Sequence, residues 1–290
     1  MTKKELEIRE NAVLYAYKYN NVDKAVQYVM QLYDRNKEKK LYRFRPPLQR
    51  EIDAIKKAEI YLCFPRMYAS KDPEDCRWID DIEALFKYEV NIRNAEKYSP
   101  YGKIFTEEKY KEMSERMINT PKYIDYKNRV SNMCLISCIS DKNTSYMWET
   151  YTENSEGLCL EYDFSNVLHA ISGLNIRLFP IRYVENRNQT KDIQFGPAEY
   201  AEDAPDELMR NKYILSCMTK NRLPYSKDSE WRVLCEQPED LPLTESGKLF
   251  PFIRPSKIHL GKNIDNNPTF KSDVIDMCTE LNIPLVQSLI

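Results

Sequence analysis

The stretch Leu41-Tyr42-Arg43-Phe44-Arg45, followed directly by Pro46-Pro47, separates a helical start from a chain of strands. Its composition predicts a strand, and the two prolines predict where that strand stops. Upstream, residues 4–37 carry the capping residues and the apolar spacing of two helices. We therefore expect a small N-terminal helical appendage over residues 1–40 and a main domain over residues 41–290.

Downstream of this stretch, strands and helices alternate irregularly. The expected strands cover residues 60–64, 133–139, 157–162, 178–184, 230–236 and 257–260, and the expected helices cover residues 48–58, 143–153, 205–219 and 271–281. Residues 78–131 are rich in Lys, Glu and Tyr and indicate a helical insertion, broken near Ser99-Pro100-Tyr101-Gly102. Because the helical insertions have uneven lengths, the chain predicts an α+β fold with a mixed or antiparallel sheet rather than a doubly wound parallel sheet.

The charge and composition of the chain limit the kinds of partner and the cellular location that we expect for it. The 43 Lys and Arg residues nearly balance the 45 Asp and Glu residues, so the net charge of −2 does not indicate nucleic acid as a partner, although a local basic patch stays open. The segment Met1–Glu5 has no apolar signal core, and no uncharged run approaches the ~20 residues that span a bilayer. The eight cysteines form no CxxC pair, which favours reduced thiols over disulfides. We expect a cytoplasmic protein that does not enter a membrane.

Several common kinds of site are not indicated. His169 and His259 are the only histidines, and neither has a second metal-ligand residue three or four positions away. Cys134 and Cys138 fall on an expected strand, where positions i and i+4 are about 13 Å apart, too far to share one metal ion. The six glycines form no Rossmann or Walker phosphate loop. The sequence therefore predicts no metal cofactor, no Ser-His-Asp triad and no nucleotide loop of these types.

Three distant segments carry polar side chains of complementary kinds. Arg43 lies on the first strand, Ser137 lies within Leu135–Ser140, and Glu230 begins the strand that follows Asp228-Ser229. Cleavage of the nicotinamide–ribose bond of NAD develops positive charge on the ribose, and a carboxylate facing that charge stabilises the transition state. We expect Glu230, Arg43 and Ser137 to be catalytic. Surface pairing of Glu230 with a lysine, a structural salt bridge of Arg43 and backbone bonding of Ser137 remain the alternatives.

Further polar and aromatic residues suit the binding of the same substrate. A guanidinium fork on the face shared by Arg43 and Arg45 matches pyrophosphate oxygens. Aromatic rings three residues apart on one helix stack on nicotinamide or adenine, or else pack in the core. The residues expected to contact NAD are Tyr42, Arg45, Ser140, Trp148 and Tyr151. Asp228 and Arg232 are expected to orient the acceptor, with a solvated Asp228 and a structural Arg232 as the alternatives.

The order of the motifs resembles an uncharacterised family of bacterial proteins, a domain of unknown function. The resemblance spans roughly residues 41–262, and this chain has Tyr68-Ala69-Ser70 where the family has Phe-Asn. The motifs that carry it are Leu41–Arg45, Asp72-Pro73, Ser137-Cys138-Ile139-Ser140, Met147-Trp148-x-x-Tyr151, Gly157-Leu158-Cys159-Leu160, Glu230-Trp231-Arg232 and Ile258-x-Leu260-Gly261. This resemblance implies an architecture and no activity.

The chain also bears a remote resemblance to ADP-ribosyltransferases of the Arg-Ser-Glu type. The matching positions are Arg43, Ser137 and Asp228-x-Glu230, where Asp228 stands for the first glutamate of the family's Glu-x-Glu. The resemblance implies an ADP-ribosyltransferase-like fold and an enzyme that transfers ADP-ribose from NAD to a macromolecule or hydrolyses NAD, in a bacterial toxin or in phage defence. The alternative is a non-catalytic protein-interaction module of a stress or defence system, which would bind its partner through the N-terminal helices and residues 78–131.

Overall fold

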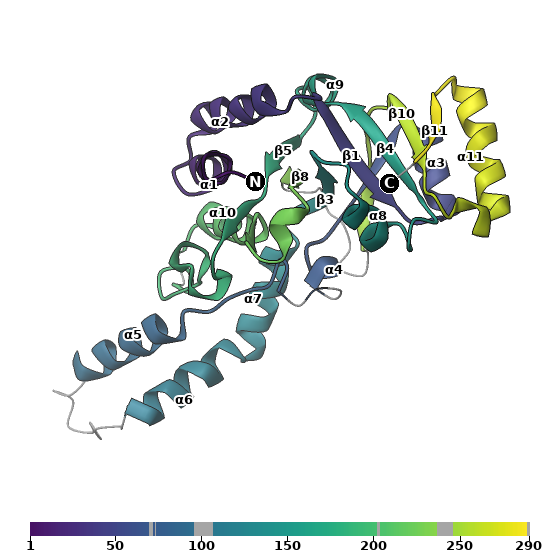
Figure 1. Ribbon diagram of the computed structural model, residues 1–290. Helices are drawn as coiled ribbons and strands as arrows, with labels where there is room; N and C mark the ends of the chain where they lie inside the picture. Colours follow the sequence, from purple (N-terminus) through teal and green to yellow (C-terminus); the bar gives the residue numbers. More distant parts are fainter. Residues whose placement is uncertain (70–71, 73, 96–106, 202–203, 237–245, 289–290) are drawn as a thin grey trace.

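The chain folds into a mixed α/β structure around a large, mostly antiparallel open sheet (Figure 1). The computed structural model describes residues 1–69, 72, 74–95, 107–201, 204–236 and 246–288. Its strands are β1 (Lys40–Arg45), β2 (Glu59–Cys63), β3 (Cys134–Ser140), β4 (Leu158–Asp163), β5 (Ile176–Pro180), β6 (Arg182–Val184), β7 (Thr219–Asn221), β8 (Glu230–Glu236), β9 (Gly247–Pro251), β10 (Lys257–Leu260) and β11 (Leu285–Gln287). In the described chain, all of them except β6 and β7, which form a separate pair, belong to the large sheet.

Strand β3 lies at the centre of this sheet, and its two edges are used differently. One edge pairs along its full length with β8, from Cys134 opposite Glu236 to Ser140 opposite Glu230. The other edge meets β1 only at the pair Tyr42–Ser140, and it meets β2 only at the pair Cys63–Ile136. Between these two bridges, residues 137–139 are not paired with any strand on that edge in the described chain. We call this gap between β1 and β2 the seam.

The remaining strands extend the sheet on both sides. Strand β4 pairs with β1, β10 with β4, and β11 with β10, the last pair being parallel. Strand β9 pairs with β2, and β5 pairs with β8. Gly157, just before β4, lets the chain approach the end of β1, because a Cβ atom there would lie 2.1 Å from the carbonyl oxygen of Arg45.

Helices cover the ends and faces of the sheet. They are α1 (Lys3–Tyr17), α2 (Val22–Arg35), α3 (Gln49–Lys56), α4 (Arg66–Ala69), α5 (Ile82–Ala95), α6 (Glu107–Ile118), α7 (Pro121–Ser131), α8 (Ser145–Tyr151), α9 (Phe164–Ile171), α10 (Asp206–Cys217) and α11 (Pro268–Leu281). Figure 1 shows α3 and α11 together near β10, while α1, α2 and α10 gather near β5 and β8. The same view shows α5 and α6 side by side, projecting away from the rest of the molecule.

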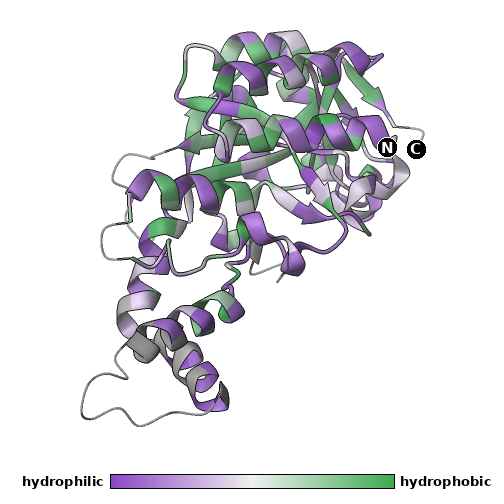
Figure 2. Cartoon of the chain, turned by 90° about the vertical axis from the view of Figure 1, so that its left-hand side faces the viewer, coloured by the Kyte–Doolittle hydropathy of each residue, from purple (hydrophilic) through white to green (hydrophobic). Residues whose placement is uncertain are grey.

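The two N-terminal helices pack onto the main domain and share its apolar cluster, while the predicted division between residues 1–40 and residues 41–290 stays a prediction. Helix α1, which Thr2 caps, contacts β5, β6 and α10 and buries Ile8, Ala12 and Val13 together with the charged Arg9. Ala12 and Val13 are fully buried in the same apolar cluster as the strands of the sheet. Figure 2 shows this interior as green strands beneath helices with mixed faces. The helical pair therefore shares a core with the strands of the sheet.

Most of the predicted strands occur close to their expected ends, and two of them, β8 and β10, match at both ends. The single strand expected over residues 178–184 is divided into β5 and β6 at Ile181. Strands β7, β9 and β11 and helix α9 were not predicted. Residues 78–131 do contain helices, α5 to α7, whereas the predicted break at 99–102 and Pro73 of the Asp-Pro motif lie outside the described residues.

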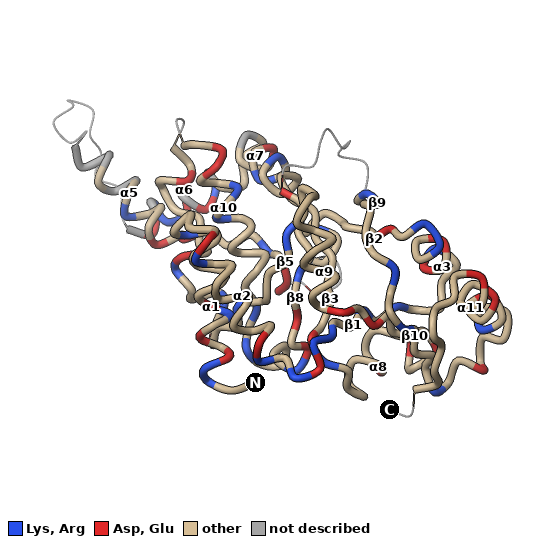
Figure 3. The backbone as a smooth tube through the Cα atoms, turned by 90° about the horizontal axis from the view of Figure 1, so that it is seen from above, with Lys and Arg blue, Asp and Glu red and all other residues tan. Residues whose placement is uncertain are grey.

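Charged residues of both signs are distributed along the helices (Figure 3), and none of the cysteines forms a disulfide bond. Lys, Arg, Asp and Glu alternate along the helices, as the blue and red segments of Figure 3 show. All eight cysteines are free thiols. Within the described ranges, no helix has both the length and the apolar character needed to cross a bilayer.

Candidate functional site

Four charged side chains form a closed ring beneath β8. Arg232, on β8, forms a two-pronged ion pair with Asp75, with N–O distances of 2.6 and 2.9 Å, and contacts the Glu230 carboxylate at 2.7 Å. Lys220, on β7, lies 3.0 Å from Glu230 and 3.6 Å from Asp75. Two anions and two cations therefore alternate around the ring, and all four side chains are buried.

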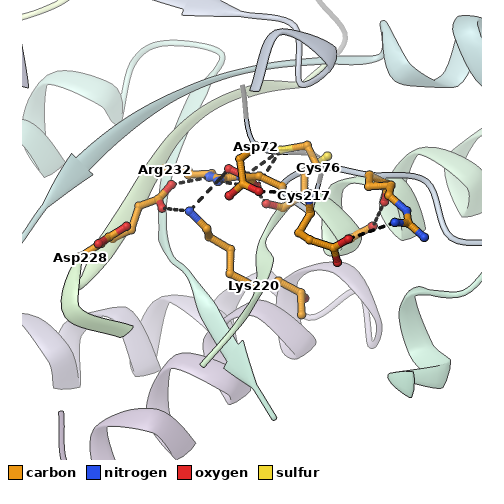
Figure 4. A network of polar contacts seen from close by, with 12 residues as sticks. Asp72, Cys76, Cys217, Lys220, Asp228 and Arg232 are labelled. Atoms are coloured by element: carbon orange, nitrogen blue, oxygen red, sulfur yellow. Dashed lines mark hydrogen bonds and ion pairs between the residues drawn. The ribbon is translucent and has the colours of Figure 1, made fainter. Parts of the chain in front are cut away.

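The ring keeps its groups ionised despite burial. Burial alone raises the pKa of the Glu230 carboxyl, but the positive charges of Arg232 and Lys220 outweigh it and hold the pKa below its usual value. The same two cations hold the pKa of Asp75 well below its usual range. The Lys220 ammonium, whose pKa burial lowers, is held well above its usual value by Glu230 and Asp75. Figure 4 shows Lys220 and Arg232 within this network.

Asp228 lies to one side of the ring and has a different environment. Its side chain is 1% exposed, its Oδ2 accepts a 2.8 Å hydrogen bond from the hydroxyl of Tyr151, and its Oδ1 has no partner in the described chain. Burial, followed by the negative charge of Glu230, raises its pKa to about 6. A buried carboxyl with a pKa near neutrality, beside a charged network, is typical of a general acid or base.

The backbone that carries Asp228 is held in a strained turn. Ser229 adopts a left-handed conformation with φ of 43°, which is unfavourable for a residue with a Cβ atom. The turn is fixed from both sides: Ser140 donates a 2.6 Å hydrogen bond to the Asp228 carbonyl, and Arg9 donates to Ser229 Oγ and to the Glu230 carbonyl. Strain that is held by several contacts is common at functional sites.

Five of the residues proposed from sequence come together here. Ser140 and Tyr151 contact Asp228, and Glu230 and Arg232 belong to the ring. Tyr151 is the exposed member of the group, with 39% of its surface accessible, and it lies between Asp228 and solvent. Tyr151 and Ser140, which were expected to contact NAD, both lie beside Asp228: Tyr151 donates to its carboxylate, and Ser140 donates to its backbone carbonyl.

Arg43 and Ser137 do not lie with Glu230, so the expectation of one pocket around these three is wrong. The pairs Tyr42–Ser140 and Ser140–Glu230 put those three side chains on one face of the sheet. Successive residues of a strand point to opposite faces, which directs Arg43 and Ser137 to the other face. There the Arg43 guanidinium lies 3.3 Å from Ser137 Oγ and 3.9 Å from Glu51.

This second group carries an excess of positive charge. Arg43 and Arg45 both face the carboxylate of Glu51, which Arg45 contacts through two nitrogens. Arg43 is 4% exposed and its Nε atom has no partner in the described chain. Burial, followed by the charge of Arg45, lowers the pKa of Arg43. The structural alternative for Arg43, a salt bridge, accounts for its contact with Glu51 and leaves Nε unexplained.

Tyr42 and Trp148 lie apart from both groups. With Phe44, Met147 and Cys159 they form a small apolar cluster under α8, in which Trp148 is fully buried and packs edge-on against Phe44. The Tyr42 hydroxyl donates to Glu38, and the Trp148 indole N–H donates to Asn143. Both rings are therefore buried in this cluster, and for Trp148 packing in the core was the alternative to stacking on NAD.

Sequence reasoning missed Asp75, Lys220 and Arg9. Asp75 follows the Asp-Pro motif in a loop, where an acidic residue has no distinguishing pattern. Lys220 offered a weak signal, because a lysine directly after the apolar end of a helix at Cys217-Met218 is unusual unless a carboxylate pairs with it. Arg9 occurs in a charged helix and looks like a surface residue until the fold places it against β8.

The residues around the ring do not form a metal site in the described part of the chain, where no group of three or more His, Cys, Asp or Glu side chains is placed to hold an ion. Both cations of the ring occupy the positions where a metal would have to bind the carboxylates.

Comparisons with models of known protein families, with curated proteins and with solved structures found no match for this chain.

Proposed function

We propose that this protein is an NAD-consuming enzyme whose catalytic carboxylate is Asp228. The observation that carries the proposal is the state of this side chain: buried, with one oxygen unpartnered, and with a pKa of about 6. This replaces the role first given to Glu230, whose two oxygens are already engaged by Lys220 and Arg232. NAD as the substrate is supported by the sequence resemblance to ADP-ribosyltransferases.

The reaction needs one carboxylate beside the ribose. The bond between ribose C1′ and the nicotinamide nitrogen breaks, its electron pair leaves with neutral nicotinamide, and positive charge develops on the ribose. The unpartnered Oδ1 of Asp228 would face that charge. Water, or a nucleophile of an acceptor, then forms the new bond to C1′ and releases one proton, which the Asp228 carboxylate accepts. Ionised Asp228 is required in both steps, so turnover should fall as the pH drops through about 6.

Tyr151 controls access to this carboxylate. It is the half-exposed cover of a side chain that is otherwise buried, and its hydroxyl holds Oδ2. A substrate reaches Oδ1 only when the Tyr151 ring swings outward, a rotation of a kind common for exposed side chains. The displaced ring then provides an aromatic face for nicotinamide.

The same proposal includes an ADP-ribosyltransferase-like arrangement, with a macromolecular acceptor or water as the second substrate and a role in a bacterial toxin or in phage defence. The contact between Arg43 and Ser137 supports it, since this pair is part of the motif that the resemblance rests on. The excess positive charge at Arg43 and Arg45 suits a diphosphate, although it lies across the sheet from Asp228.

Release of nicotinamide by the pure protein tests the proposal. We expect the wild-type chain to release nicotinamide from NAD, and Asp228→Asn to reduce the rate about 10²–10³-fold, the usual cost of removing one preorganised electrostatic contact. The matched control is Asp276→Asn, an exposed aspartate on α11, which should retain full activity. Chromatography of the reaction mixture measures the product, and NAD labelled on the adenylate, incubated with bacterial lysate, distinguishes transfer from hydrolysis.

Two results would count against the proposal. Wild-type protein that releases no nicotinamide and labels no lysate component would remove NAD as the substrate. Full activity in Asp228→Asn would instead keep the reaction and remove Asp228 from it.

A second candidate function is a non-catalytic interaction module, and one observation favours it. The α5–α6 pair projects from the body of the molecule in Figure 1, and Tyr88 on α5 is 49% exposed. A projecting helical pair with an exposed aromatic ring is suited to contact with another protein. If the protein neither cleaves NAD nor transfers its ADP-ribose group, we propose the interaction module in place of the enzyme.

A further inference from the structure

A separate pocket lies at the N-terminal helices, behind the turn that carries Asp228. It has a volume of about 200 Å³ and is formed by the start of α1, the end of α2 with residues 36–38, the turn after β3, and Ser229. We propose that this pocket binds the diphosphate group of a small ligand. The proposal concerns binding alone and does not depend on any reaction at Asp228.

The carboxylates in this pocket are already engaged. Glu5 completes the cap of α1 by accepting from the Thr2 backbone, Glu38 accepts from the hydroxyl of Tyr42, and Asp141 accepts from Arg9 and from the indole N–H of Trp231. Of these three, only Asp141 is paired with a cation in the described chain, Arg9. Glu5 and Glu38 are bonded by neutral donors, so both keep a negative charge at the pocket.

The cations in the pocket outnumber its unpaired carboxylates. Arg35, Lys37 and Lys142 line it together with Met1, and all three side chains are exposed. Lys142 and the amino group of Met1 interact electrostatically with Glu5. The three side chains come from two separate parts of the chain, the end of α2 and the turn after β3, and converge on one small volume. These cations and the Met1 amino group exceed the charges of Glu5 and Glu38, and a net positive charge around a concave site favours an anion with more than one charge.

Arg9 provides a fixed inner wall. Its side chain is 2% exposed, and its guanidinium contacts the Glu230 carbonyl at 2.8 Å, Asp141 at 2.5 Å and Ser229 Oγ at 3.0 Å. These contacts hold the guanidinium rigid, and its charge is paired with that of Asp141. The inner wall is thus a fixed ion pair, and the adjustable cations at the rim provide the attraction for a ligand.

The size of the pocket limits the ligand. Its volume is about 200 Å³. Sites for complete drug-sized ligands usually exceed about 300 Å³. A diphosphate fits this volume, whereas a nucleoside attached to it would extend into solvent.

Titration calorimetry with three probes tests the proposal. We expect inorganic pyrophosphate and ADP to bind with similar affinities and adenosine not to bind, because the pocket contacts only the phosphates. Lys142→Glu should weaken pyrophosphate binding about tenfold or more, since charge reversal replaces an attraction with a repulsion. Lys262→Glu, the same change at an exposed lysine away from the pocket, should bind as the wild-type chain does.

A thermal melt of each variant confirms that both are folded, and both positions are exposed. No heat of binding for pyrophosphate with the wild-type chain at millimolar concentration would overturn the proposal. Equal weakening in Lys142→Glu and Lys262→Glu would also overturn it, because it would show general attraction to the surface. Affinity for ADP far above that for pyrophosphate would show that the site recognises the nucleoside instead.

Discussion

At the level of single residues, Asp228 is ionised at neutral pH at a cost to the folded state. Its carboxyl loses its proton near pH 3.8 in a model peptide and near pH 6 in the folded protein. Between these values the folded chain holds a proton that the unfolded chain releases. The stability that comes from the raised pKa is therefore present below about pH 4 and is lost as the pH rises through about 6.

Replacing this carboxyl should stabilise the protein at neutral pH. We expect Asp228→Asn to raise the free energy of unfolding at pH 7.5 by about 1–2 kcal/mol. This is less than the ~3 kcal/mol that corresponds to the change in pKa, because the new amide N–H groups need acceptors in a buried place. The gain should disappear near pH 4. Urea unfolding at both pH values measures it, with Asp276→Asn as the control, and a destabilised variant at pH 7.5 would contradict the assignment of Asp228.

Replacement of Glu230 should destabilise the protein, in contrast to replacement of Asp228. Glu230→Gln removes one anion from the buried ring and leaves Lys220 and Arg232 with only Asp75 between them. We expect a loss of about 3–5 kcal/mol in the free energy of unfolding, as is usual when one partner of a buried ion pair is removed. Glu7→Gln, on the exposed side of α1, should have little effect.

A double variant checks that the loss arises in the ring. Lys220→Met combined with Glu230→Gln leaves the Arg232–Asp75 pair intact and balances the charges. It should therefore lose less stability than the two single variants predict by addition. Strict additivity would show that the four side chains do not act as a unit.

At the level of elements, α1 is a structural member of the domain, and its removal should not leave a folded remainder. A sharper test than deletion uses two valines of the helical pair. Val13 is fully buried against the sheet, whereas Val26 on α2 is 47% exposed. We expect Val13→Asp to abolish cooperative unfolding or lower its midpoint strongly, because it buries an unpaired charge. Val26→Asp should melt like the wild-type chain, and equal behaviour of the two would support a separate appendage.

The strands show which elements can be predicted from sequence alone. β8 and β10 match their predictions because apolar runs with clear ends carry a local signal. β9 is half-exposed along its length and β11 has three residues, so neither carries an apolar run long enough to detect. These strands form because a neighbouring strand offers its hydrogen bonds, and that information is not local.

At the level of the whole molecule, sequence predicts the class of fold better than the site. The α+β class follows from the order and lengths of the elements, and the structure confirms a mixed, mostly antiparallel sheet. The position of the site, by contrast, depends on which residues pair across neighbouring strands. The residue pairs Tyr42–Ser140 and Ser140–Glu230 decide that Arg43 and Glu230 point to opposite faces, and a shift of one residue in either pair would have brought them together.

The seam beside β3 has a mechanical consequence. On that edge the halves of the sheet around β1 and around β2 are each tied to β3 by one residue pair, Tyr42–Ser140 and Cys63–Ile136. Two halves of a sheet that are joined in this way resist stretching along β3. They bend about it easily, because bending breaks few backbone hydrogen bonds. Ser140 forms one of these ties and also holds the carbonyl of Asp228. The backbone connection between the half of the sheet around β1 and the turn that carries Asp228 therefore runs through Ser140, beside the side-chain contact of Arg43 with Ser137.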